Sequence, residues 1–306
     1  MPATIVPAAV VARAQRLRRA NVIGVAWGDA QVGGAWTGER IPSVHVRRKR
    51  HPSELGPGER VPSGRGRRVD VLEVSHLRQL QIDCGDPVTL LPDPARGASA
   101  ISLCARSGRH NLVLVSGHGA LPLVRGKLPA LYDAAVDGPA QLSIVDDAPR
   151  VWSCEIEQGR IDDRCDFAVA RVPGDIQLLH YAAAAQAPIR VRTDPLVLDQ
   201  PLRQFAPTRR RAVEGQLKQV MCGLAWVPGV GGQKFPYRDV LIASARVPGH
   251  GPFSRPGDSG SLVVDDAGQC VGFVVAGDPV ADVTYVLPPW GAIAALGSAA
   301  QDFFTW

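Results

Sequence analysis

The sequence predicts a mainly β protein built from β-barrels, with a small α+β module at its N-terminus. Gly and Pro are frequent in the 306-residue chain (32 and 26 residues), and aromatic residues make up only 6% of it. This composition favours many turns and short strands over long helices. From about residue 84 onward, short alternating apolar runs follow one another, separated by Gly, Pro, Asp and Asn. Many short strands with such punctuation are typical of β-barrels.

Residues 1–80 have a pattern of their own and form the predicted N-terminal module. An amphipathic helix is expected over residues 8–19, and a turn is expected at Gly33 and Gly34. The expected strands cover residues 22–27, 41–46 and 69–74, and a short helix or turn covers 52–55. A unit of this size would bury its apolar strand faces poorly alone. We therefore expect it to dock onto the rest of the chain or onto another subunit, which leaves a homo-oligomer open.

Residues 81–306 form the second predicted domain. The segment Ser107–Asn111 is typical of a hairpin turn between two strands, and Asp265–Gly268 joins another pair. A closing C-terminal helix is expected around residues 293–297. The expected strands cover residues 102–106, 112–116, 167–172, 212–224, 240–247, 262–264 and 271–276.

Charge and hydropathy argue against several classes of function. The net charge is +5 and the pI about 9.1, with basic clusters at residues 47–50, 65–68 and 209–211. No aromatic residues interleave with these bases, so we expect solvated surface and no nucleic-acid partner. No apolar run is long enough to span a bilayer. The apolar stretch 3–12 is followed rather than preceded by arginines, which is the wrong polarity for a secretory signal. We expect a cytoplasmic protein without a membrane partner.

The cysteines favour reduced thiols over a disulfide framework. They are spread widely over a chain for which no export signal is expected, and no C-x-x-C pair occurs. We therefore expect no zinc site and no other metal site. The six are Cys84, Cys104, Cys154, Cys165, Cys222 and Cys270.

The strongest local motif is the sequence PGDSGS at residues 256–261. A serine hydroxyl is a poor nucleophile at neutral pH, and it needs a neighbouring base and amide donors for the oxyanion that forms on the substrate. Gly257 allows a tight turn in which the N–H groups of Gly257 and Ser259 point at one spot. Gly260 leaves room beside the nucleophile. The alternative is a Gly-rich hairpin that carries a surface serine.

His118 is the best candidate for the base. None of the seven histidines follows Ser259, which excludes an α/β-hydrolase with this nucleophile. His118 lies at the end of an apolar strand, between Gly117 and Gly119, and so has a rigid and accessible mount. The alternative, His250, lies in a Pro-Gly-His-Gly-Pro loop without such a mount.

Asp166 is the candidate that would orient the imidazole. An orienting acid should be buried and accept from the imidazole N–H. Asp166 opens the alternating strand DFAVARV directly after a turn, where it can be drawn into the core. Asp162 and Asp163 are the alternatives, and they have the pattern of solvated turn residues.

These motifs together carry a resemblance to a known family. The sequence GDSGS followed by LVVDDAGQCVGFVVAG, with SGH upstream and DFAVARV between, resembles the trypsin/chymotrypsin-like serine peptidases from about residue 84 to the C-terminus. The segments NVIGVAWG, TGE and VDVLEV resemble the N-terminal extension of a bacterial branch, and a plant leaf-development trypsin-like protease is similar to that branch.

The resemblance implies a fold and a reaction. The fold would be two six-stranded antiparallel β-barrels (chymotrypsin-like), at about residues 84–180 and 190–290, followed by the C-terminal helix. The reaction would be hydrolysis of peptide bonds in a protein or peptide substrate through an acyl-enzyme. Ser259 would attack, His118 would shuttle the proton and Asp166 would orient His118. No metal or organic cofactor is implied.

The sequence departs from the family in three places. Gly119 stands where secreted members carry a cysteine. No Ile-Val-Gly-Gly-like activation sequence is present, so Asp258 is not expected to pair with a newly cut N-terminus. Phe253 stands where trypsins carry a pocket acid, so a preference for Lys or Arg is not supported. The other wall of the pocket would be lined by Val275, Ala276 and Gly277, which predicts an apolar or small side chain at the cut site.

Two other hypotheses about function stay open at the level of sequence. One is a non-catalytic or self-processing regulatory or binding module on a trypsin-like fold. The other is an adaptor that binds nucleic acid or an acidic partner through the basic N-terminal module, with binding that weakens steeply with salt.

Overall fold

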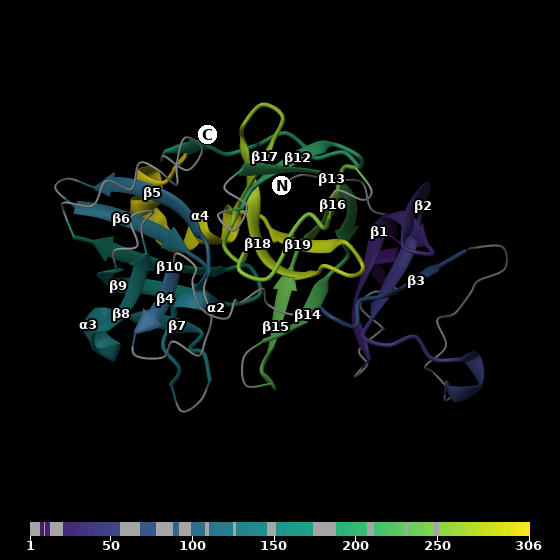
Figure 1. Cartoon of the computed structure of the whole chain (residues 1–306), viewed down its shortest axis with the longest axis horizontal. Helices are drawn as coiled ribbons and strands as arrows, with labels where there is room; N and C mark the ends of the chain where they lie inside the picture. Colours follow the sequence, from purple (N-terminus) through teal and green to yellow (C-terminus); the bar gives the residue numbers. More distant parts are fainter. Residues whose placement is uncertain are drawn as a thin grey trace.

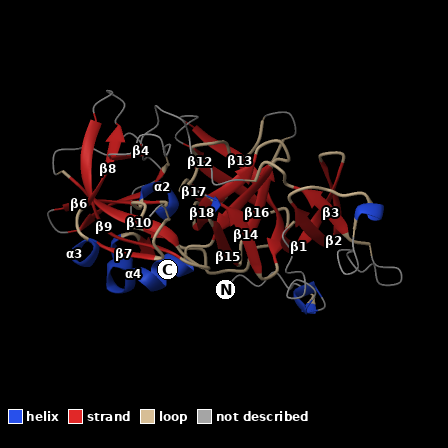
Figure 2. Ribbon diagram, turned by 90° about the horizontal axis from the view of Figure 1, so that it is seen from below, coloured by secondary structure: helices blue, strands red, loops and turns tan. Residues whose placement is uncertain are grey.

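The fold consists of two large β-sheets with few and short helices. The computed structural model describes residues 7–8, 10–12, 21–55, 68–77, 88–91, 99–107, 110–124, 127–145, 151–173, 188–206, 211–229, 232–247 and 251–306. Strands dominate the described part of the chain, and the longer helical segments lie at the periphery (Figure 2). No helix among the described residues is long and apolar enough to cross a membrane.

The second half of the chain forms a closed six-stranded antiparallel barrel. Its strand order is β12-β17-β18-β19-β16-β13, and the pairing of β12 with β13 closes the circle. The strands are β12 (Pro201–Ala206), β13 (Arg211–Met221), β16 (Leu241–Ala245), β17 (Leu262–Asp265), β18 (Cys270–Asp278) and β19 (Val283–Leu287). Its core contains side chains that alternate inward along these strands, as closure of a small barrel requires.

Residues between 88 and 172 form a second antiparallel sheet in the order β4-β8-β9-β10-β6-β5, with β7 paired to β9. Two helices of one turn, α2 (Gly117–Ala120) and α3 (Ala134–Asp137), belong to this part of the chain. The strands are β4 (Val88–Leu91), β5 (Ile101–Ser107), β6 (His110–Val115), β7 (Leu131–Asp133), β8 (Ala140–Val145), β9 (Val151–Ile161) and β10 (Asp166–Val172).

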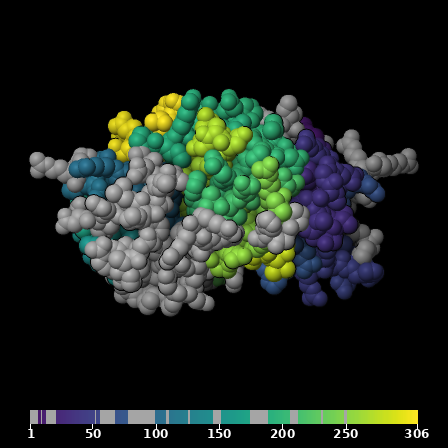
Figure 3. Space-filling model, turned by 45° about the horizontal axis from the view of Figure 1, so that its top comes forward, coloured from purple at the N-terminus to yellow at the C-terminus, as the bar shows by residue number. Residues whose placement is uncertain are grey.

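The N-terminal strands continue the sheet of the closed barrel. β1 (Val22–Val32) pairs with β2 (Ala35–Val46) and with β13, while β3 (Asp70–Glu73) runs parallel to β2, and a short 3-10 helix, η1, covers Pro52–Glu54. The three strands lie at one end of the molecule, with the closed barrel in the middle and the other sheet beyond it (Figure 1). The surface of this N-terminal part is continuous with that of the barrel (Figure 3).

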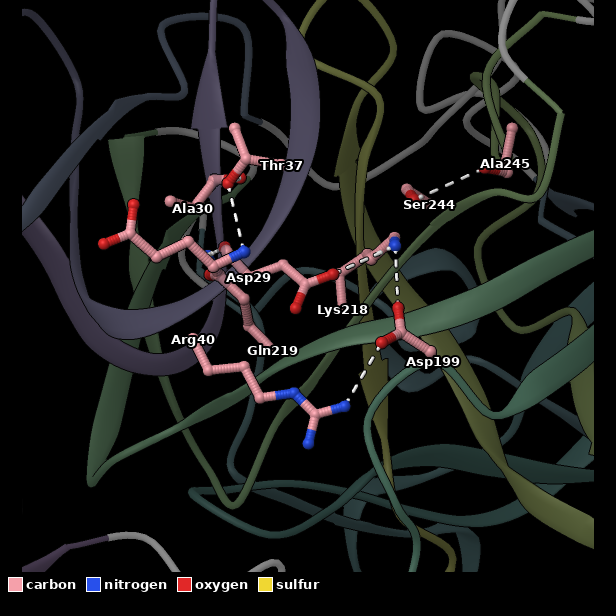
Figure 4. Close-up of polar contacts among 10 residues, drawn as sticks. Asp29, Ala30, Thr37, Arg40, Asp199, Lys218, Gln219, Ser244 and Ala245 are labelled. Carbon is pink, nitrogen blue, oxygen red and sulfur yellow. Dashed lines mark hydrogen bonds and ion pairs between the residues drawn. The ribbon is translucent and has the colours of Figure 1, made fainter.

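Two polar clusters, each centred on a buried side chain, join β1 and β2 to the barrel. In the first, Nζ of Lys218 lies 3.1 Å from Oδ2 of Asp29 and 2.9 Å from Oδ1 of Asp199, and Arg40 also contacts Asp199 (Figure 4). Gly28 lets the chains approach here, since a Cβ atom on it would lie 2.1 Å from the carbonyl oxygen of Lys218. Burial raises the pKa of Asp29 above its ordinary value, although Lys218 acts in the opposite direction.

The second cluster is centred on a buried histidine. Nδ1 of His45 lies 2.7 Å from the hydroxyl of Tyr285, and Nε2 lies 2.6 Å from Oε1 of Gln219. The amide nitrogen of Gln219 in turn donates to Oγ of Ser43 and to the carbonyl oxygen of Asp29. Burial lowers the pKa of His45 to about 4. These contacts and the β1–β13 pairing dock the N-terminal strands onto the closed barrel. The domain boundary at residue 80 stays a prediction.

Smaller elements connect the two sheets. β14 (Leu224–Pro228) and β15 (Lys234–Arg238) form a separate hairpin, and β11 (Ile189–Arg190) pairs in parallel with β20 (Phe304–Thr305). The C-terminal α4 (Trp290–Leu296) and the 3-10 helix η6 (Gly297–Asp302) share an apolar cluster with strands of both sheets. The C-terminal segment therefore packs across the junction of the two sheets.

The predicted fold class is confirmed, because the described residues form a mainly β structure with a closed six-stranded antiparallel barrel and a second sheet. Several predicted boundaries differ from the structure: the strand expected over 22–27 extends to Val32, and the strand expected over 41–46 begins at Ala35. The strand expected over 212–224 ends at Met221, because Gly223 adopts a φ of 96° and a new strand begins at Leu224. The C-terminal helix expected around residues 293–297 covers Trp290–Leu296. The expected helix over 8–19 falls largely outside the described residues.

Candidate active site

Three side chains that the sequence singles out lie in one hydrogen-bonded chain. Nδ1 of His118 lies 2.5 Å from Oδ2 of Asp166, and Nε2 of His118 lies 2.9 Å from Oγ of Ser259. The backbone N–H of His118 donates to the other carboxylate oxygen of Asp166 at 2.8 Å. Asp166 therefore holds His118 by two contacts and directs the second ring nitrogen at the serine hydroxyl.

The sequence around His118 explains how the imidazole is mounted. A Cβ atom on Gly117 would lie 2.9 Å from the carbonyl oxygen of Phe167, and one on Gly119 would lie 2.5 Å from Cβ of Ser99. Both positions therefore require glycine, and the Gly-His-Gly sequence lets α2 pack closely on its neighbours. Asp166 is the first residue of β10, and β10 pairs with β6, the strand that leads into α2. The pairing of these two strands sets the separation of the base and the acid.

Ser259 lies in a turn that both sheets hold. Its carbonyl oxygen accepts a hydrogen bond from Oγ of Ser99 at 2.8 Å, and Oγ of Ser102 donates to the carbonyl oxygen of Gly260 at 2.5 Å. On the other side, the N–H of Gly260 donates to the carbonyl of Val274 in β18 at 2.7 Å. The position of the hydroxyl therefore depends on β5 and its preceding residues as well as on the closed barrel.

The turn before the serine carries the two amide donors that are predicted to form the oxyanion hole. Gly257 has a φ of 94°, which only glycine adopts readily. Within the described part of the chain, no acceptor is recorded for the N–H groups of Gly257 and Ser259. The carboxylate of Asp258 accepts from the N–H of Arg255 at 2.8 Å and so stabilises the same turn. Unpaired donors beside a serine hydroxyl are what an oxyanion hole needs, and this assignment stays a prediction.

Burial and charge define the state of the site. His118 and Ser259 are completely buried, as is the side chain of Asp166. Burial acts to raise the pKa of Asp166, but the charge of His118 and the hydrogen bonds from His118 and Tyr237 outweigh it and hold that pKa below its usual range. The carboxylate is therefore ionised at neutral pH. The hydroxyl of Ser259 is covered in this structure.

The four residues predicted to bind substrate are all buried. Phe253 packs in the core of the closed barrel, against the backbone of Gly215, where a Cβ atom would lie 2.5 Å from the ring. Val275 and Ala276 belong to a different apolar cluster, and Gly277 follows them in β18. The structure does not bring Phe253 into the cluster of Val275 and Ala276, and the pocket role of these residues stays a prediction.

The turn that follows β18 is held by the N-terminal strands. Oδ2 of Asp278 accepts from the N–H of His76 at 2.9 Å, while its Oδ1 accepts from the N–H of Ala281 at 3.0 Å. The side-chain amide of Gln31 in β1 donates to the carbonyl oxygen of Ala281 at 2.9 Å. Residues before position 80 therefore fix the end of the strand that is predicted to bind substrate.

The alternative acids have other contacts. Asp162 accepts from the N–H of Cys165 at 2.8 Å, within the turn before β10. Asp163 accepts from Nε of Arg238 at 2.8 Å, and this pair is partly exposed. Both therefore have the structural roles expected of turn residues. The alternative base, His250, lies outside the described residues.

One residue of this site was missed by the sequence analysis. The hydroxyl of Tyr237 donates to Oδ2 of Asp166 at 2.8 Å. Tyr237 lies in β15, 71 residues after Asp166 in the chain. A lone tyrosine in a short hairpin strand gives no signal in the sequence for such a contact.

No metal site is found within the described ranges, since no group of three His, Cys, Asp or Glu side chains could hold an ion there. The five cysteines in these ranges are free and buried. Burial raises the pKa of four of these thiols to about 12, and that of Cys270 further. The four are Cys104, Cys154, Cys165 and Cys222.

The comparison with protein-family models found no match, and the comparison with curated proteins found none. Solved structures similar to this chain include a protease from M. tuberculosis in its active form, with 17% identity over 64% of this chain and 70% of that chain (TM-score 0.40). Thermobifida fusca Protease A is 14% identical over 70% and 94% of the two chains (TM-score 0.41). A glutamic acid-specific serine protease is 14% identical over 69% and 96% (TM-score 0.42). Similarity at this level carries no functional argument, which has to come from the site itself.

Proposed function

We propose that this chain is a serine endopeptidase of the trypsin/chymotrypsin type, with Ser259 as nucleophile, His118 as general base and Asp166 as the orienting acid. The observation that carries the proposal is the continuous hydrogen-bonded chain from Asp166 through His118 to the hydroxyl of Ser259. A buried serine hydroxyl, an imidazole and a carboxylate in this order are the groups that acyl transfer requires.

The proposed reaction proceeds in two halves. His118 accepts the proton of the Ser259 hydroxyl while its oxygen attacks the peptide carbonyl, and the N–H groups of Gly257 and Ser259 bind the resulting oxyanion. His118 then donates its proton to the leaving amine, and an acyl-enzyme remains. Water attacks the ester in the same way, with His118 again taking the proton, and Ser259 is regenerated. Asp166 stays ionised throughout and stabilises the imidazolium.

The proposed substrate is a protein or peptide with an apolar or small side chain at the cut site. Phe253 offers no carboxylate for a basic side chain, and Val275, Ala276 and Gly277 would form an apolar wall. A location in the cytoplasm and a homo-oligomer formed through residues 1–80 remain further predictions. Their tests are localisation of the tagged full-length chain and light scattering of the purified protein.

The experiment is hydrolysis of a peptide library by the purified wild-type chain and by its Ser259→Ala variant. We expect cleavage after apolar or small residues in the wild type, and a loss of turnover of several orders of magnitude in the variant. Circular dichroism and thermal unfolding check that the variant keeps its fold. Equal turnover in the two proteins would overturn the assignment, and a dominant preference for Arg or Lys would overturn the pocket.

A further inference from the structure

The hairpin of β14 and β15 connects the closed barrel to the other sheet. At its tip, Oε1 of Gln233 accepts from the N–H of Leu128 at 3.0 Å. At its base, Arg238 donates through its backbone N–H to the carbonyl oxygen of Asp163 and through Nε to the carboxylate of Asp163. The hairpin is therefore tied at both ends to the first sheet, and its second tie lies in the turn that leads into β10.

Between these two ties the hairpin brings one phenol to the acid of the proposed triad. Tyr237 is completely buried and packs beside Phe235, with ring centroids 6.2 Å apart. Its hydroxyl lies 2.8 Å from Oδ2 of Asp166, the same oxygen that faces Nδ1 of His118. The neutral phenol can only donate to a carboxylate, so one oxygen of Asp166 receives hydrogen bonds from both Tyr237 and His118.

We propose that Tyr237 is a positioning residue of the triad, one that fixes the carboxylate of Asp166 and thereby the orientation of His118. This role rests on the function proposed above. The hydroxyl prevents rotation of the carboxylate away from the imidazole, and it favours the ionised form of the acid in a fully buried site. Since Tyr237 comes from the hairpin after β13, while Asp166 opens β10, the contact also couples the triad to the relative position of the two sheets.

The surroundings of Asp166 allow a prediction of sign. The titratable groups that face it are His118 from α2, Tyr237 from β15 and the thiol of Cys165 directly before it, with the Asp163–Arg238 pair in the adjoining turn. Removal of the phenol takes away a donor that disperses the negative charge of Asp166, so the carboxylate holds a proton on the imidazole of His118 more strongly. Protonation of the base ends turnover at low pH, so the acidic limb of the pH–rate profile should move to higher pH.

The test compares the Tyr237→Phe and Tyr132→Phe variants of the full chain. Tyr132 is a matched control, because it is also buried and its hydroxyl donates to a backbone oxygen, that of Gly138, at 2.6 Å. The rate of labelling of Ser259 by a fluorophosphonate is measured against pH, and kcat and KM are measured with a peptide from the library.

For Tyr237→Phe we expect a labelling rate and a kcat lower by about tenfold, the loss of one hydrogen bond to a charged group, together with an unchanged KM and a displaced acidic limb. Tyr132→Phe should keep the wild-type limb. If the two variants had the same acidic limb in their pH–rate profiles and the same rates, the proposal would be overturned and Tyr237 would be a packing residue. If Tyr237→Phe fails to fold, 3-fluorotyrosine at position 237 replaces it. Because its phenol is a stronger donor, the acidic limb of the pH–rate profile should move to lower pH. The same substitution at position 132 should leave the limb unchanged. An identical limb in the two proteins would again overturn the positioning role of Tyr237.

A readout without turnover separates this proposal from the proposed function. The proton on Nδ1 of His118, in its short contact with Asp166, should give a low-field NMR resonance that shifts in Tyr237→Phe and not in Tyr132→Phe. A shift in a protein whose Ser259 is unreactive would disprove the peptidase and keep the Tyr237 contact. No shift in an active peptidase would disprove the role of Tyr237 alone.

Discussion

Two completely buried histidines lie at different junctions of this molecule and differ in their partners. His118 lies between the carboxylate of Asp166 and the hydroxyl of Ser259, whereas His45 lies between the neutral side chains of Tyr285 and Gln219. A neighbouring carboxylate stabilises an imidazolium, while a neutral, buried environment opposes one. Burial alone therefore does not set the role of a histidine, because the charge of the neighbouring group decides whether an imidazolium would be stabilised.

The same contrast separates the roles of the two regions. The His118 cluster lies where the two sheets meet, and its polar groups face a serine. The His45 cluster and the Lys218 cluster lie between the N-terminal strands and the closed barrel, and their polar groups face one another. We expect changes in the first to abolish chemistry with little effect on stability, and changes in the second to lower stability with little effect on chemistry.

The largest expected effect separates the two histidines by activity. His118→Ala should lower kcat/KM by roughly 10⁴-fold or more, since it removes the base. His45→Gln should retain the wild-type value within a few-fold, because it leaves the triad intact. The measurement is steady-state hydrolysis of one peptide by both variants, with folding checked by circular dichroism. A comparable loss of activity in the two variants would contradict the division of roles.

The next effect concerns the ion cluster that joins β1 to the barrel. Lys218→Met would leave the buried carboxylate of Asp29 without its counter-charge, and we expect a loss of about 3–5 kcal/mol in the free energy of unfolding. Denaturant titration measures this loss. The double variant Asp29→Asn/Lys218→Met should recover much of it, because the uncompensated charge is gone. A single variant as stable as the wild type would show that the cluster does not hold the strands together.

The third effect is the pH dependence of stability. The pKa of His45 is lowered from 6.5 to about 4 in the folded chain, so the unfolded state binds more protons between these values. The stabilising contribution is present above pH 6.5 and is lost as the pH falls towards 4, by roughly 3 kcal/mol. His45→Gln cannot titrate and should show a shallower fall over this window in denaturant titrations. Parallel curves for the two proteins would refute the contribution of His45.

The smallest effect tests the link between the N-terminal strands and the predicted substrate strand. Asp278→Ala removes the acceptor for the N–H groups of His76 and Ala281. We expect KM to rise a few-fold with kcat unchanged, because the turn after β18 is loosened while the triad is not touched. Steady-state kinetics with a library peptide measures this split. A fall in kcat at constant KM would place the effect in the triad instead.

The sequence was sufficient for the fold class and for the residues of the triad candidate, because both depend on local patterns. Alternating strands, glycine turns and the surroundings of Ser259 are encoded within a few neighbouring residues. The contact of Tyr237 with Asp166 and the Lys218 cluster were not predictable. Each joins side chains that are far apart in the sequence, and neither has a motif. Only the register of β13 and the path of the β14–β15 hairpin bring these groups together.

The most direct test of the central claim is covalent labelling of the wild-type chain with a fluorophosphonate, followed by peptide mapping by mass spectrometry. The account predicts one modified residue, Ser259, and loss of the label in both Ser259→Ala and His118→Ala at neutral pH, because the hydroxyl is reactive only beside the imidazole. Labelling of a different serine, or labelling of Ser259 at the same rate in His118→Ala, would contradict it.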